Sequence, residues 1–321
     1  MKGTWKLQLR LIVVMAVLFL IVYTLASIAG YYLGFGGSLS FYLIISLIII
    51  FAQYWFGPSI VKMSMKVRPL SETEAPHIHQ MVEELAAEAG IKKPKIGLSE
   101  VNIPNAFAYG RSSRSGHIAL TRPIIGLLTR DELKAVIGHE MGHIKHNDMI
   151  VTSMVSVIPM ICYYIALSFM FSRDSENNSG FIIGIIGYVF YFIGQLLVLC
   201  VSRIREYYAD AASVEFGNKP AALASALYKL SYGAAKANNE ELKDINTTRA
   251  FFVNDINNGA RDITSFRQID FDGDGSISDE ELRRISESNI KVKSSAKFME
   301  ILSTHPDMLK RVKRLSELEN Q

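Results

Sequence analysis

The sequence predicts a mainly α-helical membrane protein in which four transmembrane helices carry an α+β domain assembled from two segments of the chain. Long uncharged apolar runs occur in two pairs, and each run is long enough to cross a bilayer. The segments that follow each pair are more polar and show helical or strand periodicity instead. Of the 321 residues, 49% are hydrophobic and 20% are charged, a balance that suits this division between bilayer and domain.

The first pair of apolar runs lies in residues 1–57. No charged side chain occurs from Leu11 to Ile60, and a break rich in glycine divides this stretch into runs at about 11–33 and 39–56. Each run has the length of a membrane-spanning helix. We therefore expect two transmembrane helices before the first part of the domain.

The second pair lies in residues 150–201, as runs at about 150–171 and 181–201 joined by a polar loop. Basic residues flank all four runs on one side of the membrane, which by the positive-inside rule predicts cytoplasmic ends. These residues are Lys2, Lys6, Arg10, Lys62, Lys66, Arg68, Lys145, Arg203 and Arg205. We therefore expect a multi-pass protein of the cell membrane, with the domain and both termini in the cytoplasm.

The pattern HEMGH, which begins at His139, is the strongest chemical signal in the chain. Thr129 and Glu132 form a capping box ahead of it, which predicts that the motif lies on a helix. On a helix, His139 and His143 lie one turn apart on one face and can bind one zinc ion. Glu140 beside them can act as the general base toward zinc-bound water. The motif therefore predicts the metal centre of a zinc hydrolase.

A catalytic zinc site of this kind needs a third protein ligand. In the second segment of the domain, residues 202–255, Glu206 can supply a ligand carboxylate, and Asp210 can fix the tautomer of a ligand histidine. If two antiparallel helices leave the bilayer together, His143 lies roughly 10 Å and Glu206 roughly 8 Å above the hydrocarbon. We therefore expect Glu206 beside His143 and Asp210 beside His139. The alternative is a solvated helix face with no ligand role.

The first segment of the domain, residues 58–149, contains a second capping box before a predicted helix over residues 77–89. Strand-like residues at 95–101 and 117–121 predict a short sheet. Residues 105–108, which precede the strand at 117–121, could form an edge strand that pairs with an extended peptide. The Asn105 side chain could then hold a substrate carbonyl. The substrate-binding candidates are Asn105, Ala106, Phe107 and Ala108. An ordinary hairpin strand is the alternative.

The last segment, residues 293–321, opens with HPDMLKR and continues as a helix rich in lysine and arginine. One interpretation places His305 and Arg311 over the oxyanion of a tetrahedral intermediate, where they would assist catalysis. The other is a basic amphipathic helix that lies near the membrane surface.

Residues 256–292 contain an acidic insertion that fits a twelve-residue EF-hand-like loop, and residues 261–269 and 279–288 can supply its flanking helices. Oxygen-bearing side chains fall at positions 1, 3, 5 and 9, glycine at position 6 and glutamate at position 12. The candidate ligands for Ca²⁺ or Mg²⁺ are Asp270, Asp272, Asp274, Ser276, Ser278 and Glu281. A structural ion and a regulatory ion both fit the sequence, and a solvated acidic turn is the alternative.

Four motifs resemble the HtpX-type membrane zinc endopeptidases, which are related to the CAAX prenyl proteases. In chain order they are PNAFA, HEMGH followed by His146-Asn147-Asp148, SRIREYYADA and STHPDMLKR. The resemblance covers nearly the whole chain and implies a zincin-like fold for the cytoplasmic domain. It also implies roles for residues already described. These are zinc ligation by His139, His143 and Glu206, general-base catalysis by Glu140, support by Asp210, substrate positioning by Asn105, and transition-state assistance by His305 and Arg311. Asp307 departs from the pattern, since many relatives have a second proline there.

Together these features predict a membrane-embedded zinc endopeptidase that cleaves misfolded or unassembled membrane proteins at the cytoplasmic face, with modulation by Ca²⁺ at the acidic loop. The expected partners are polypeptides and the lipid bilayer. A net charge of +3 gives no reason to invoke nucleic acid. A membrane-anchored divalent-cation sensor or scaffold is the alternative function, and prenyl-protein processing is an alternative substrate class.

Overall fold

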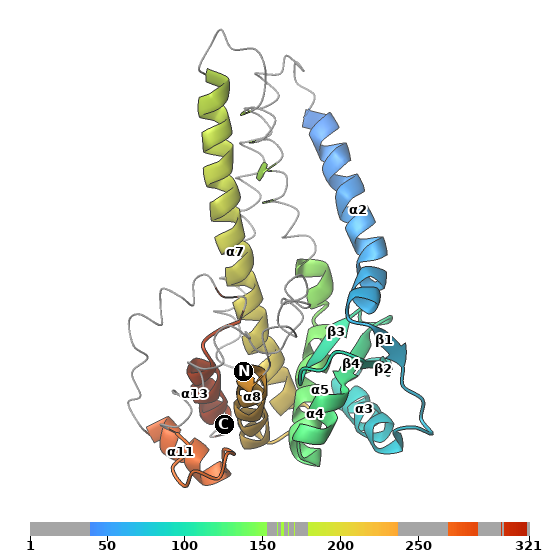
Figure 1. The fold of residues 1–321 in the computed structure, drawn as a ribbon, viewed down its shortest axis with the longest axis vertical. Coiled ribbons are helices and arrows are strands. Elements are labelled where there is room, and N and C mark those ends of the chain that lie inside the picture. The colour runs from blue at the N-terminus through green and yellow to red at the C-terminus, as the bar shows by residue number, and fades with distance from the viewer. Residues whose placement is uncertain are drawn as a thin grey trace. The chain divides into compact units, whose positions relative to one another are not determined.

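The computed structural model describes residues 39–152, 179–236, 269–287 and 305–319, together with the single residues 159, 162, 163, 166, 170 and 303. Within these residues the protein is mainly helical and contains one small mixed sheet (Figure 1). The chain divides into two compact units. The first consists of Met1–Phe56 and Ile150–Ile204, and the second of Gly57–Met149 and Arg205–Gln321.

The described part of the first unit comes mostly from two long helices, α2 (Leu39–Ser64) and α7 (Ser179–Glu215), which both continue into the second unit. Among the described residues one helix is long and apolar enough to cross a membrane, the Gly184–Glu215 stretch of α7. The predicted run at 39–56 falls on α2, whereas the run at 11–33 and most of the run at 150–171 lie outside the described residues. Of the predicted set of four, the structure therefore identifies one candidate span.

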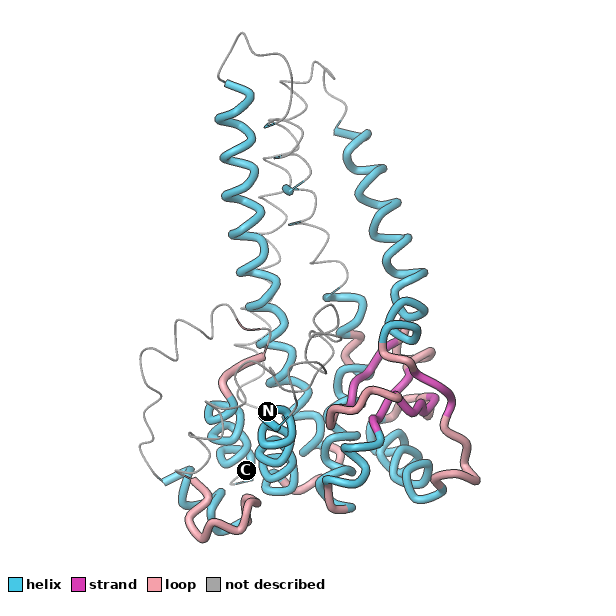
Figure 2. The backbone as a smooth tube through the Cα atoms, in the orientation of Figure 1, coloured by secondary structure: helices cyan, strands magenta, loops and turns pink. Residues whose placement is uncertain are grey.

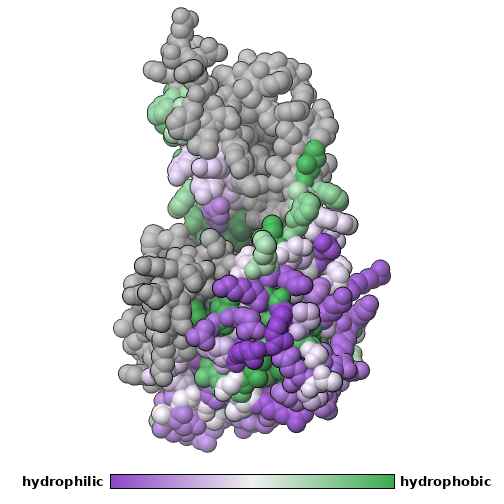
Figure 3. All heavy atoms as spheres, turned by 45° about the vertical axis from the view of Figure 1, so that its right-hand side comes forward, coloured by the Kyte–Doolittle hydropathy of each residue, from purple (hydrophilic) through white to green (hydrophobic). Residues whose placement is uncertain are grey.

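Large apolar side chains are exposed along both long helices. Phe51 and Trp55 on α2 are 62% and 50% exposed, and Phe181 and Phe192 on α7 are 55% and 54% exposed. Figure 3 shows hydrophobic side chains along α2 and mostly hydrophilic ones over the visible face of the second unit. Apolar surface of this extent suits contact with lipid better than contact with water.

The sheet of the second unit has the strand order β1-β2-β4-β3. Its strands are β1 (Val67–Pro69), β2 (Lys95–Ser99), β3 (Ala106–Tyr109) and β4 (His117–Thr121). Strands β2 and β4 are parallel, and β3 pairs antiparallel with β4. One side of β3 is thus a sheet edge, as the sequence predicts for this strand, while the short strand β1 was not expected (Figure 2).

The sheet separates two groups of buried side chains. Because neighbouring strand residues point to opposite faces, Ile118 and Leu120 join the main core, while Ala119 joins a smaller cluster with Val61 and Met65 from the end of α2. The main core also receives side chains from seven helices, one of which is α7 through Ala212. The other six are α3 (Pro76–Ala89), α4 (Arg122–Leu127), α5 (Arg130–Lys145), α8 (Pro220–Lys236), α11 (Asp279–Glu287) and α13 (Met308–Glu319).

The predicted capping box before α3 is wrong. Helix α3 begins at Pro76 without a side-chain cap, because proline at the first turn has no N–H to satisfy and its ring favours helical φ. Ser71 and Glu74 instead close a turn ahead of the helix, in which the Glu74 N–H donates to the Ser71 carbonyl at 3.2 Å. The helix ends as expected at Gly90, which adopts a left-handed conformation with φ of 66°.

The capping box at the start of α5 is present. Thr129 accepts a hydrogen bond from the Glu132 N–H at 3.4 Å, and the Glu132 carboxylate accepts one from the Thr129 N–H at 2.8 Å. Farther along α5, a Cβ on Gly142 would lie 2.9 Å from the Ala212 Cβ and 3.0 Å from the Ala209 Cα. Helices α5 and α7 therefore approach so closely that only glycine fits at this position. This approach brings the HEMGH motif against the segment that carries Glu206.

Candidate metal centre

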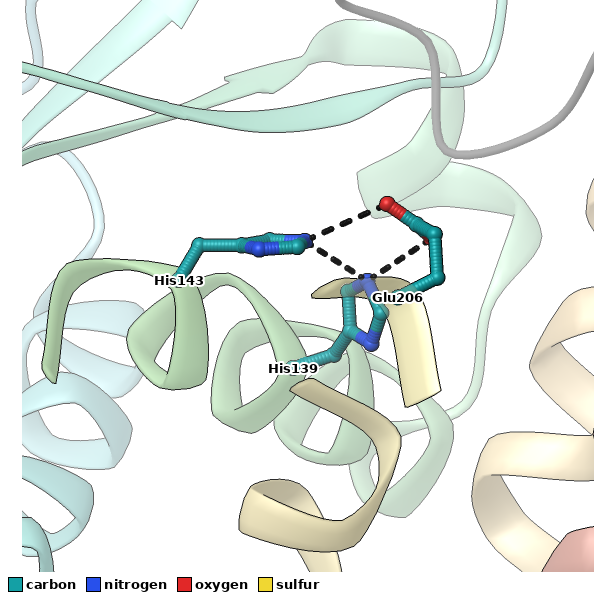
Figure 4. Close-up of side chains that lie close together, drawn as sticks. All are labelled: His139, His143 and Glu206. Carbon is teal, nitrogen blue, oxygen red and sulfur yellow. Dashed lines mark hydrogen bonds and ion pairs between the residues drawn. The ribbon is translucent and has the colours of Figure 1, made fainter. Parts of the chain in front are cut away.

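Three side chains that the sequence proposes as metal ligands lie together in the second unit (Figure 4). The Nε2 atoms of His139 and His143, both on α5, are 3.2 Å apart. The two carboxylate oxygens of Glu206, on α7, lie 3.6 Å from His139 Nε2 and 3.5 Å from His143 Nε2. The two imidazole nitrogens and the Glu206 carboxylate therefore face the same small volume.

The spacing of these donors fits a zinc ion. Tetrahedral ligands about 2.1 Å from a common centre are separated by about 3.4 Å. The two imidazole nitrogens are 3.2 Å apart, and a different Glu206 oxygen lies near each of them, at 3.6 Å from His139 and 3.5 Å from His143. Two imidazole nitrogens and one carboxylate oxygen are also a donor set that zinc accepts in hydrolytic sites, with a fourth position left for water or substrate.

Asp210 and Arg311 support the His139 side of the cluster. Asp210 Oδ1 lies 2.9 Å from His139 Nδ1, the ring nitrogen that faces away from Glu206. Arg311, on α13, is fully buried and donates two hydrogen bonds to the Asp210 carboxylate, at 2.9 and 2.6 Å. Its remaining terminal nitrogen lies 3.3 Å from Glu206. Arg311 thus spans the two carboxylates that α7 contributes.

Asp148 occupies the corresponding place beside His143, and the sequence reasoning did not identify it. Its carboxylate hydrogen-bonds to His143 Nδ1 at 2.7 Å and forms a close ion pair with Arg205. The residue lies beyond the end of α5, so helical spacing gave no signal for this contact. Two hints were available. Asp148 closes the HEMGH motif that carries the resemblance, and Asn147 just before it is a residue type that tolerates the left-handed conformation.

The charges around Glu206 favour its ionised form. Burial by itself raises the pKa of this carboxyl, but His305, the two ligand imidazoles and Arg311 outweigh burial and hold the pKa well below its usual range. Nε2 of His305, just before α13, is 3.8 Å from the Glu206 carboxylate. Glu206 is therefore a carboxylate at neutral pH, which is the form that a metal requires.

Glu140 lies between the histidines in the motif and is buried, with 3% of its surface exposed. Burial raises the pKa of its carboxyl, while the two imidazoles and a backbone hydrogen bond from Ala108 act in the opposite direction without cancelling the rise. The contact with Ala108 joins the motif to the edge strand β3. The carboxyl thus stands between the ligand cluster and the strand.

The other predicted substrate residues are largely enclosed. Asn105, Ala106 and Phe107 are 1%, 0% and 3% exposed, whereas Ala108 is half-buried. The backbone N–H of Asn105 donates to the Thr121 hydroxyl at 2.9 Å. The start of β3 is therefore fixed against β4, and the accessible part of the strand is near Ala108.

The acidic insertion forms a compact loop in which carboxylate oxygens of Asp270, Asp272 and Asp274 lie within 4.8 Å of one another. Gly275, at the sixth position, has φ of 82°, and helix α11 follows the loop. The Tyr228 hydroxyl of α8 donates to Asp270 at 3.0 Å. The predicted helix before the loop, at 261–269, lies almost wholly outside the described residues.

A buried cluster of two histidines and a glutamate, on a capped HEMGH helix next to a sheet edge, defines the protein as a metalloprotease. The family model described as "Peptidase family M48" matches residues 72–319. The chain belongs to this family.

The similar curated proteins include several named "Protease HtpX homolog", and two of them illustrate the match. The one from Methanothermobacter thermautotrophicus is 52% identical over 71% of this chain and 87% of its own length. The one from Pyrococcus abyssi is 33% identical over 90% of this chain and 89% of its own length. A solved structure, that of S. mikatae Ste24p, is 19% identical with a TM-score of 0.47, and the match covers 97% of this chain and 66% of that chain. The family model and the two curated relatives confirm the resemblance to HtpX-type proteases.

Proposed function

We propose that this metalloprotease is a zinc endopeptidase of the cell membrane that cleaves misfolded or unassembled membrane proteins at the cytoplasmic face. The observation that carries the zinc assignment is that the two imidazole nitrogens lie 3.2 Å apart and that each has an oxygen of the Glu206 carboxylate within 3.6 Å, a spacing close to that of donors on one zinc ion. His139, His143 and Glu206 would hold the ion. When bound, zinc supplies a Lewis acid that polarises a peptide carbonyl and lowers the pKa of water.

Glu140 acts as the general base in this proposal. It accepts the proton of the attacking water and passes it to the nitrogen of the leaving amine, so that the peptide bond breaks without a covalent enzyme intermediate. Its burial supports this role, because burial raises the pKa of the carboxyl and a carboxylate with a raised pKa is a stronger base than an exposed one.

Strand β3 provides a template for the substrate backbone. An extended peptide could add along its outer edge by main-chain hydrogen bonds, which require no particular side chains. Ala108 is the suitable meeting point, since it is half-buried and its backbone contacts Glu140. The enclosed residues Asn105, Ala106 and Phe107 would then act by fixing the strand. Broad side-chain tolerance suits a protease that removes damaged proteins.

The proposed membrane substrates are supported by the helix that carries the third ligand. Glu206 lies on α7, in the same continuous helix as the apolar stretch that is long enough to cross a bilayer. A metal ligand on such a helix is tied to the end of the membrane segment. Segments of membrane proteins that emerge near this end are the polypeptides nearest to the site.

His305 and Arg311 have different roles in this proposal. His305 is 6% exposed and lies 3.8 Å from Glu206, so it is close enough to the cluster to stabilise negative charge that develops on a substrate oxygen. Arg311 is fully buried and its guanidinium holds Asp210 and Glu206. We therefore assign Arg311 to the support of the ligands.

The test of the protease assignment uses purified full-length protein in proteoliposomes with a misfolded membrane protein as substrate. Glu140→Gln should retain one zinc ion per chain and lose at least 10²-fold in cleavage rate, the lower range for a general base. Glu88→Gln, on the exposed face of α3, is the matched control and should cleave at the wild-type rate. Wild-type cleavage by Glu140→Gln would refute the assigned base.

We further infer that the acidic loop binds Ca²⁺ or Mg²⁺ and modulates the enzyme. The inference is supported by the positions of its oxygens and by the left-handed Gly275, which an EF-hand loop needs at its sixth position. Calorimetry with each ion on the full-length protein tests it. Glu281→Gln should weaken ion binding and leave basal cleavage intact, whereas Glu206→Gln should abolish cleavage outright. A Glu281→Gln variant that cleaves nothing would favour a cation sensor at this loop over simple modulation.

A further inference from the structure

Each ligand imidazole has its own carboxylate and arginine. On one side of the cluster are His139, Asp210 and Arg311, and the corresponding contacts beside His143 are made by Asp148 and Arg205. The first chain of contacts contains Asp210, which the sequence already suggests as a supporting residue. The second is built from Asp148 and Arg205, which stand in the motifs quoted for the resemblance but to which the sequence assigns no role in the metal centre.

A turn of the backbone places Asp148 beside His143. Helix α5 ends at Lys145, and the two-residue turn that follows contains Asn147 in a left-handed conformation with φ of 54°, directly before Asp148. The Asn147 side chain holds this turn by accepting a hydrogen bond from the Ser113 N–H at 2.8 Å. A non-glycine residue in this conformation costs free energy, so the surrounding contacts must maintain it.

Arg205 fixes the other side of Asp148. Its guanidinium pairs with the second carboxylate oxygen and also donates at 2.8 Å to the carbonyl of His146, the residue that caps α5. Both Asp148 and Arg205 are buried, with 5% and 8% of their surfaces exposed. Because Arg205 precedes Glu206 in the chain, this pair connects the end of α5 directly to the third ligand.

We propose that Asp148 and Arg205 form a positioning pair that holds His143 in its metal-binding tautomer and ties it to Glu206. This inference rests on the proposed zinc function. A carboxylate can only accept a hydrogen bond, so Asp148 selects the tautomer with hydrogen on Nδ1 and leaves the Nε2 lone pair toward Glu206 and His139. Arg205 prevents the carboxylate from rotating away, since it occupies the opposite oxygen.

Removal of such a partner typically weakens metal binding 10–100-fold. The affinity of purified full-length protein for Zn²⁺ in detergent is measured by competition with a chromogenic chelator, and Co²⁺ absorption reports the ligand geometry. Asp148→Asn should raise the apparent Zn²⁺ dissociation constant about 10–100-fold and change the Co²⁺ spectrum. Asp131→Asn, on the exposed first turn of α5, is the control and should change neither.

Two further variants separate positioning from folding. Asp148→Glu keeps the charge opposite Arg205 but displaces the carboxylate by one methylene, so it should fold and still bind Zn²⁺ about tenfold more weakly. If Arg205 acts through Asp148, adding Arg205→Gln to Asp148→Asn should weaken binding no further.

The inference is overturned if folded Asp148→Asn or Asp148→Glu protein binds Zn²⁺ as tightly as the wild type with an unchanged Co²⁺ spectrum. Fully additive effects of the Asp148 and Arg205 changes would overturn the role assigned to Arg205. Wild-type protein that binds no Zn²⁺ would instead overturn the proposed function, and this inference with it.

Discussion

The contact between Gly142 and α7 allows a prediction whose size follows from the structure. In Gly142→Ala the added Cβ would meet the Ala212 Cβ at 2.9 Å, the Ala209 Cα at 3.0 Å and the Ala209 carbonyl oxygen at 3.2 Å. None of these atoms can move by a rotamer change, because two belong to the backbone and the third is itself a Cβ. Helices α5 and α7 must therefore separate by about 0.5 Å or more to restore ordinary contacts, and overpacking of this kind costs about 1–3 kcal/mol.

Gly126→Ala provides the matched control, since a Cβ on Gly126 in α4 meets nothing within 4 Å. Both substitutions gain about 1 kcal/mol of helix propensity, so the difference between them isolates the overpacking cost. We expect the free energy of unfolding of Gly142→Ala to lie about 1–3 kcal/mol below that of Gly126→Ala, in denaturant titrations of the metal-free protein.

Zinc affinity should fall as well, because Glu206 lies one helical turn before Ala209 and moves away with it from the two histidines. The same two proteins are compared by chelator competition. If Gly142→Ala matches Gly126→Ala in both stability and zinc affinity, the close approach of the two helices does not set the ligand spacing.

Two other predictions concern buried charged groups. Burial raises the pKa of Glu132, but hydrogen bonds from Lys229, Ser225 and the Thr129 N–H lower it by more than burial raises it. The folded pKa is therefore below the unfolded value. This stabilisation is present above the unfolded pKa of about 4.3 and is lost as pH falls through the folded pKa. The melting temperature of the wild type should accordingly drop more between pH 6 and pH 3 than that of Glu132→Gln, and parallel curves would contradict this account. Arg311→Lys keeps the charge but loses the paired hydrogen bonds to Asp210, so Zn²⁺ affinity should fall about tenfold, whereas Lys310→Arg next to it should bind normally.

Local chemistry explains which features could be anticipated. The capping box of Thr129 and Glu132 and the one-turn spacing of His139 and His143 depend only on residues within a few positions of one another. Such features follow from helix geometry whatever surrounds them. The strand beginning at Ala106 could be recognised as an edge for the same reason, since a glycine-rich turn follows it directly. Sequence spacing failed before α3, because Pro76 supplied a different start from the polar pair ahead of it.

The sequence by itself determined the kinds of metal donor and their order along the chain. Tertiary structure decided which groups support them, because those contacts join residues far apart in the chain. Arg311 reaches Asp210 across 101 positions, and Arg205 reaches the carbonyl of His146 across 59. Asp148 is close to His143 in sequence, yet its contact requires the left-handed turn at Asn147, which is held from outside by Ser113. Periodicity describes one element at a time, whereas the packing of α5, α7 and α13 fixes where buried charges can be paired.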